Sequence, residues 1–148
     1  MNRNRHLKVN SYSKFFAFRM ISLLSVFNYV PFLGSTKIET ENGIMILTEN
    51  NFKKALDEHE PLLVKFYLPW CNRCRNFAPE YLKVGEMLKN SHINIGQVDV
   101  ETEKALLKEH KIKAFPAVRL FRNGTYINYM GLQKAEHIAA WAQRHCEQ

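Results

Sequence analysis

Two cysteines separated by two residues, Cys71 and Cys74, are the side chains of this sequence best suited to chemistry. A Cys-x-x-Cys pair either binds zinc or works as a redox dithiol. Zinc needs a second pair of Cys or His ligands, and the only other cysteine, Cys146 beside His145, has the wrong spacing. A purely structural disulfide is disfavoured because so short a ring restrains little of the unfolded chain. We therefore predict a redox-active pair and no metal site.

The predicted placement of the two sulfurs suits thiol chemistry. Cys71 follows an apolar strand and a turn, so we expect it at the first position of a helix, with Cys74 one turn later on the same face. Unpaired N–H groups there carry about half a positive charge, and Arg73 and Arg75 add full charges. Both effects should lower the pKa of Cys71 below its ordinary value of about 8.5. Cys71 is thus the predicted nucleophile, and Cys74 the thiol that resolves the mixed disulfide.

Strand and helix patterns alternate around this pair. They predict strands at 44–47, 62–67, 93–100, 117–121 and 125–130, and helices at 51–58, 71–89, 102–110 and 133–144. The strand at 62–67 is almost continuously apolar, which indicates a central strand covered on both faces. Pro79 should break or kink its helix, and Thr102 should cap a helix that buries Ala105 and Leu106. Asn123-Gly124 is a strong hairpin signal. This order predicts a single α/β domain at residues 43–146, with a mixed sheet and helices on both faces.

The charge of the chain is concentrated at its start. The 148 residues carry a formal net charge of +7, but the first 38 hold six basic and no acidic side chains. Residues 39–148 hold 15 basic and 14 acidic ones. The basic excess therefore belongs to a leader rather than to a folded surface, and no nucleic-acid partner is predicted.

Residues 1–36 are expected to form that leader. Its 14-residue apolar stretch, Met20–Leu33, fits the core of a secretory signal peptide and is too short to cross a bilayer comfortably. Cleavage is expected near Gly34–Thr36. Two alternatives remain open: an uncleaved signal anchor, the one case in which a membrane is a predicted partner, and an arginine-rich mitochondrial presequence.

The segment Phe66–Arg75, followed by Ala78–Tyr81, resembles the thioredoxin superfamily, and within it the catalytic domains of protein disulfide isomerases. Further matches in order and spacing are Val98-Asp99, Phe115-Pro116 and Phe121–Gly124. The resemblance implies a thioredoxin fold and dithiol exchange without a bound cofactor. It also implies client polypeptides with thiols or disulfides as substrates, and glutathione or an upstream oxidase as a further redox partner. The implied location is the lumen of the endoplasmic reticulum or outside the cell, although no retention signal ends the sequence.

The same resemblance assigns roles to residues outside the dithiol. It implies that Pro116 is cis and that Phe115, Pro116 and Trp70 border the substrate groove. Lys65 occupies the position of a buried Glu or Asp that carries the proton of the second cysteine, so the sign of the local charge is reversed. Either this lysine lies under the active site or it extends to the surface. Lys113 occupies the position of an arginine that reaches toward the second cysteine. Either its charge is kept there or its side chain extends at the surface.

Three features leave questions open. The dipeptide Asn72-Arg73 replaces the Gly-His of isomerases and the Gly-Pro of thioredoxins, so their reduction potentials cannot be transferred. Asn123-Gly-Thr125 is an N-glycosylation sequon, usable only in the secretory pathway. Cys146 is expected to be a free thiol, with an intermolecular disulfide as the alternative. The competing functional hypothesis is a chaperone-like thioredoxin module that binds peptides and whose redox activity is weak or lost.

Overall fold

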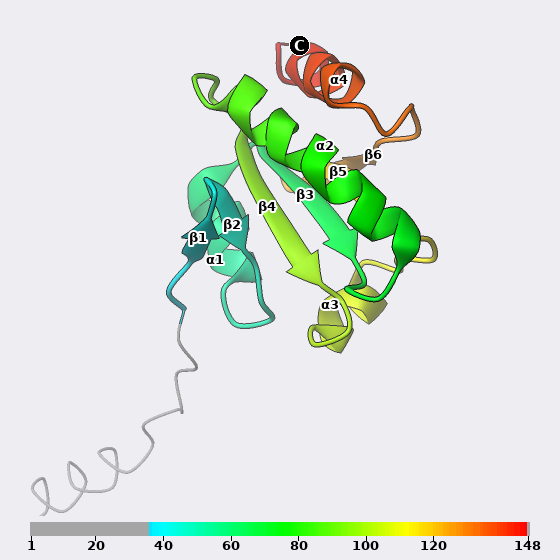
Figure 1. Cartoon of the computed structure of the whole chain (residues 1–148). Helices are drawn as coiled ribbons and strands as arrows, with labels where there is room; N and C mark the ends of the chain where they lie inside the picture. Colours follow the sequence, from blue (N-terminus) through cyan, green and yellow to red (C-terminus); the bar gives the residue numbers. More distant parts are fainter. Residues whose placement is uncertain (1–35, 148) are drawn as a thin grey trace, which may run out of the picture. The chain divides into compact units, whose positions relative to one another are not determined.

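A mixed six-stranded sheet lies at the centre of the computed structural model, which describes residues 36–147 (Figure 1). The leader predicted at residues 1–36 lies outside this range except for its last residue. The strands are β1 (Glu39–Glu41), β2 (Ile44–Ile46), β3 (Leu62–Tyr67), β4 (Asn94–Asp99), β5 (Ala117–Arg122) and β6 (Thr125–Asn128). The helices are α1 (Phe52–His59), α2 (Asn72–Leu88), α3 (Lys104–Glu109) and α4 (Ala135–Cys146). None of the helices in the described range has the length and apolar character needed to cross a bilayer.

The strand order is β1-β2-β4-β3-β5-β6, which places β3 near the middle of the sheet. β3 runs parallel to β4 and antiparallel to β5, and β2 runs parallel to β4. β1 and β6 are antiparallel edge strands. In this register Lys65 lies opposite Gln97 on one side and Val118 on the other. Lys65 and Gln97, the two polar residues, therefore lie on strands in the interior of the sheet.

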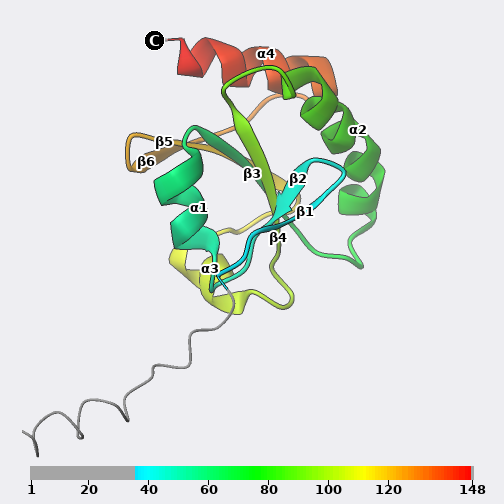
Figure 2. The same ribbon diagram turned by 90° about the vertical axis from the view of Figure 1, so that its left-hand side faces the viewer.

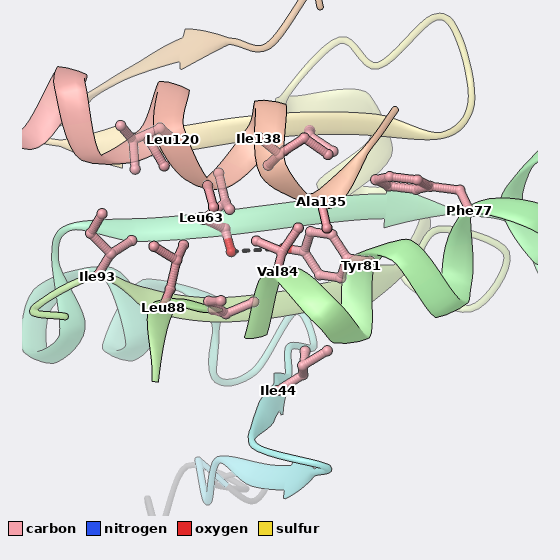
Figure 3. Packing of buried hydrophobic residues seen from close by; sticks show 14 residues of the cluster. Ile44, Leu63, Phe77, Tyr81, Val84, Leu88, Ile93, Leu120, Ala135 and Ile138 are labelled. Atoms are coloured by element: carbon pink, nitrogen blue, oxygen red, sulfur yellow. Dashed lines mark hydrogen bonds between the residues drawn. The ribbon is translucent and has the colours of Figure 1, made fainter. Parts of the chain in front are cut away.

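The central strand is covered on both faces, as its apolar sequence predicts. Leu63 packs into the core formed under α2 and α4, where Tyr81, Val84 and Ile138 surround it (Figure 3). The alternate residues Leu62, Val64 and Phe66 pack into a second core under α1 and α3. Figure 2 shows the sheet between these helices. The predicted α/β domain with helices on both faces is confirmed.

Several local expectations need correction. β1 was not predicted, because its three residues are exposed and polar and show no apolar periodicity; it precedes the expected domain start at residue 43. α2 continues past Pro79 to Leu88, so of the expected break or kink the break is wrong. Pro79 is exposed, and it removes only one backbone hydrogen bond from a helix that the core holds.

The third helix also starts differently from the prediction. Its N-cap residue is Glu103, whereas the Thr102 hydroxyl donates to the carbonyl of Asp99 at 3.1 Å. Ala105 is exposed rather than buried, and its N–H donates to the Glu49 carboxylate at 2.7 Å. The helix is therefore capped by a residue far away in the sequence, which no local pattern encodes.

The predicted hairpin is confirmed between β5 and β6. Asn123 and Gly124 both have positive φ angles, 52° and 68°. A two-residue turn of this kind matches the right-handed twist of the paired strands and favours Asn-Gly.

Tyr81 ties α2 to the middle of the sheet. It is fully buried, and its hydroxyl lies 3.0 Å from the carbonyl oxygen of Leu63 in β3 (Figure 3). The same hydroxyl lies 2.9 Å from the carbonyl oxygen of Gly96 in β4. The single hydroxyl proton is thus shared between two adjacent strands.

Removing this hydroxyl should destabilise the fold. We expect Tyr81→Phe to lower the free energy of unfolding by about 1–2 kcal/mol, because buried carbonyls lose a donor. Urea denaturation followed by circular dichroism measures the change. Tyr126→Phe, on the exposed edge strand β6, is the matched control and should stay within about 0.5 kcal/mol of wild type. Equal stability of the two variants would contradict the assigned role.

Candidate active site

The chain enters the site from β3 through a short loop and passes directly into α2. Cys71 is the N-cap residue of α2 rather than its first helical residue, because its backbone is extended, with φ −76° and ψ 118°. Its N–H donates to the Leu68 carbonyl at 3.2 Å, and its own carbonyl accepts from the Arg75 N–H at 3.0 Å. The thiol therefore lies at the helix N-terminus, one position earlier than predicted.

The two thiols have opposite environments. The pKa of Cys71 is lowered, first by a hydrogen bond from the Cys74 thiol, then by the backbone N–H groups of Cys74 and Arg73 and the charge of Arg73. Cys74 is 3% exposed, and burial raises its pKa. Cys71, in contrast, is partly exposed. The geometry therefore favours Cys71 as the attacking thiolate and keeps Cys74 protonated and shielded.

We expect alkylation to follow this asymmetry. With the reduced protein and limiting iodoacetamide near neutral pH, Cys71 should be modified before Cys74, as read from peptide masses. Cys146 is scored separately; it is partly buried, and burial raises its pKa. Modification of Cys74 before Cys71 would contradict the assignment.

The two predicted cations do not act alike. Arg73 is exposed, and its charge lowers the pKa of Cys71. The guanidinium of Arg75 instead donates to the Trp70 carbonyl at 3.1 Å and to the side-chain oxygen of Asn72. The pKa of Cys71 is therefore lowered by the charge of Arg73 rather than by that of Arg75.

Lys65 lies under the dithiol and not at the surface. It is 5% exposed, on the face of β3 that α2 covers. Burial lowers its pKa to about 8, while the charges of Cys74 and Glu41 act in the opposite direction. Of the two alternatives that the sequence left open, extension to the surface is wrong, because the packing of α2 over β3 covers this side chain.

The remaining predicted residues lie in different places. The Phe115-Pro116 peptide bond is cis, as predicted; Pro116 is buried and Phe115 half-buried. Trp70, beside the dithiol in sequence, is 63% exposed. Lys113 is exposed, and the positive charge that acts on the pKa of Cys74 is that of Lys65.

Asn123 and Cys146 lie away from the dithiol. β5 runs antiparallel to β3, and its last residues pair with Leu62 at the start of β3. The turn at Asn123 therefore lies at the start of β3, whereas the dithiol follows the end of β3. Cys146 lines a surface pocket together with Asn123. The third cysteine is therefore not part of the dithiol site, and the described residues bring no group of three or more His, Cys, Asp or Glu side chains into metal-binding proximity.

Sequence reasoning missed the residues that surround Lys65. Tyr67 and Tyr81 place their rings 4.7 and 4.8 Å from its Nζ atom, and Gln97 lines the same pocket. A usable signal was present: Lys65 and Gln97 are polar residues inside two apolar strands that pair in parallel.

A Cys-x-x-Cys dithiol at a helix N-terminus, a cis-proline directly before β5 and a mixed sheet covered by helices together define a thioredoxin-type domain. The thioredoxin family model matches residues 43–144, and the chain belongs to this family. It is 33% identical over 129 residues to a protein disulfide-isomerase of Drosophila melanogaster, covering 86% of this chain and 26% of that protein. It is 36% identical over 113 residues to protein disulfide-isomerase A2 of Mus musculus, covering 73% of this chain and 21% of that protein.

Solved structures agree with this assignment. The first thioredoxin domain of mouse protein disulfide-isomerase A4 superimposes with a TM-score of 0.70 at 28% identity, covering 77% of this chain and 82% of that one. The Trx4 domain of ERdj5 gives 0.64 at 28% identity, covering 73% and 98%. The chain is thus a domain related to protein disulfide isomerases, and it spans about a quarter of the length of the curated relatives it matches.

Proposed function

We propose that this chain is a thiol–disulfide oxidoreductase that acts on disulfides of client polypeptides in the secretory pathway. The observation that carries the proposal is the asymmetry of the dithiol: a partly exposed Cys71 of lowered pKa beside a buried Cys74 of raised pKa. Relatives named protein disulfide-isomerase support the substrate class. The location in the endoplasmic reticulum or outside the cell is inferred from that relationship and from the predicted signal peptide.

The geometry supports a two-step exchange. The Cys71 thiolate attacks one sulfur of a client disulfide, forms a mixed disulfide and displaces the other client sulfur as a thiolate. Cys74 then loses its proton and attacks Cys71, which releases the second client thiolate and leaves a Cys71–Cys74 disulfide. The client gains two electrons and the dithiol loses them. Glutathione reduces the Cys71–Cys74 disulfide and returns the domain to its dithiol form. In the opposite direction, an upstream oxidase keeps the pair as a disulfide, which then oxidises client thiols.

Reduction of insulin disulfides by the full chain tests this function. With glutathione as electron donor, the chain should accelerate the precipitation of reduced insulin chains above the rate with glutathione alone. A rate equal to that of glutathione alone would overturn the proposal.

A second candidate is a chaperone-like module that binds peptides beside Pro116. The observation favouring it is the exposed indole of Trp70 next to the dithiol. A variant with both Cys71 and Cys74 changed to Ser distinguishes the two: full suppression of client aggregation by that variant, together with an inactive wild type in the insulin assay, would support the module.

The reduction potential should depend on Arg73. We expect the wild-type potential above the thioredoxin value of about −270 mV, because a stabilised thiolate favours the reduced form. Arg73→Pro should lower it by about 10–30 mV, since both the charge and the backbone N–H of residue 73 lower the pKa of Cys71. Equilibration with defined glutathione ratios measures the shift. Arg73→Ala, which removes the charge alone, should give a smaller decrease. An unchanged potential in Arg73→Pro would show that neither the charge nor the N–H of residue 73 sets the potential.

A further inference from the structure

A buried amine and a buried thiol share one pocket behind the dithiol. Lys65 is 5% exposed and Cys74 is 3% exposed. Both line a pocket of about 190 Å³, together with Gln97 from β4 and Ala78 from α2. The alternation of β3 places Lys65 on the face that α2 covers, and Cys74 belongs to the first turn of α2. Both side chains therefore line the same pocket between β3 and the first turn of α2.

The amine lies against aromatic rings instead of a counter-ion. Its Nζ atom is 4.7 Å from the ring centroid of Tyr67 and 4.8 Å from that of Tyr81. Within residues 36–147, no carboxylate forms an ion pair with it. Glu41 from β1 acts on it only through its charge.

The other ionisable groups around the pocket do not compete for the proton. Burial raises the pKa of Tyr67 and of Tyr81, so both phenols stay neutral; the charge of Asp99, at the end of β4, acts in the same direction on Tyr67. Arg75 lines the pocket, but its guanidinium is held by Trp70 and Asn72. Because burial lowers the pKa of Lys65 to about 8, a fraction of the amine is neutral at neutral pH and can accept a proton.

We propose that the neutral amine of Lys65 accepts the proton of Cys74 when Cys74 resolves the mixed disulfide; this inference rests on the proposed function. The Cys74 thiol transfers its proton to Nζ, and its electron pair forms the bond to the sulfur of Cys71. The bond between Cys71 and the client sulfur breaks, and the client leaves as a thiolate. The ammonium then returns its proton to water through the pocket.

Burial opposes the two charges that this transfer produces, and the attraction between them acts against that cost. The positive charge of Lys65 lowers the pKa of Cys74, and the negative charge of Cys74 raises that of Lys65. Proton transfer converts a neutral thiol and amine into an attracting pair of opposite charges in a site shielded from water. Lys65 thus combines proton acceptor and counter-ion in one side chain.

Stopped-flow reaction of the reduced full chain with an aromatic disulfide reporter separates the two steps. Attack by Cys71 releases the first chromophoric thiolate, and resolution by Cys74 releases the second. A Cys146→Ser background removes the third thiol from the signal. In wild type, the second phase should accelerate between about pH 6 and about pH 9, with an inflection near the Lys65 pKa of about 8.

Three variants of Lys65 test the role of its amine. Lys65→Met should slow the second phase about tenfold or more at neutral pH, abolish the inflection and leave the first phase within about twofold. Lys65→Arg keeps the charge but cannot release a proton in this range, and should also slow the second phase. Lys65→Glu supplies another proton acceptor, so its second phase should be faster than in wild type and should show its inflection at a lower pH. This variant also tests the proposal if Lys65→Met or Lys65→Arg disturbs folding.

A lysine on another element serves as the control for the loss of an amine. Lys53→Met, on the exposed face of α1, should leave both phases unchanged. A wild-type rate and pH profile in Lys65→Arg or Lys65→Met would overturn the proposal, as would a Lys65→Glu protein, folded by circular dichroism, that is slower than wild type at every pH. Failure of the proposed function gives a different signature: insulin reduction by the wild-type chain would then equal that of glutathione alone, whether or not the reporter shows two phases.

Discussion

Cys71→Ser should reduce insulin-disulfide reduction by about a thousandfold or more, to the rate with glutathione alone. The hydroxyl that replaces the thiol does not ionise near neutral pH, and the hydrogen bonds and the charge of Arg73 that favour the thiolate then have no sulfur to act on. The turbidity assay of the proposed function measures the loss.

Two further variants sharpen this result. Cys74→Ser should also lose turnover, but it should accumulate a mixed disulfide between Cys71 and the client, visible by non-reducing electrophoresis. Cys146→Ser is the matched control: it removes the one cysteine that lies away from the dithiol, and should retain wild-type activity. Substantial activity in Cys71→Ser, or a mixed disulfide through Cys74, would refute the assigned roles.

Phe66→Ala should produce the largest loss of stability, about 3–5 kcal/mol in the free energy of unfolding. Phe66 is fully buried in β3. The centroid of its ring lies 6.3 Å from that of the Phe52 ring and 6.4 Å from that of the Phe121 ring. Truncation removes buried apolar surface and leaves a cavity between the sheet and α1. Urea denaturation monitored by circular dichroism measures the decrease.

Met87→Ala on α2 provides the comparison for this prediction. Met87 is 49% exposed, so its truncation should change the free energy of unfolding by no more than about 0.5 kcal/mol.

Phe66 and Lys65 are neighbours on opposite faces of β3, so Phe66→Ala should also weaken the strand beneath the dithiol. Cys74 should then become accessible to alkylation at lower urea concentrations than in wild type. Equal stability of the two variants would contradict the central position of β3.

Most of the fold and the dithiol could be predicted from short stretches of the sequence. The apolar run of β3 predicted a strand covered on both faces, and Asn123-Gly124 predicted the hairpin, because each depends on residues within a few positions. The spacing of Cys71 and Cys74 predicted two thiols on one face of a helical turn, and their opposite environments follow from that placement.

Tertiary structure decided what depends on distant neighbours. β1 has a polar sequence and is a strand because β2 pairs with it, and α3 is capped by Glu49 through a contact between residues 56 positions apart. For Lys65, the sequence determined the residue but not its environment, since an amine on a long side chain can reach water or remain buried. Packing of α2 over β3 removes that amine from water and sets it beside Cys74, because desolvation is a property of the whole assembled core and not of any local segment.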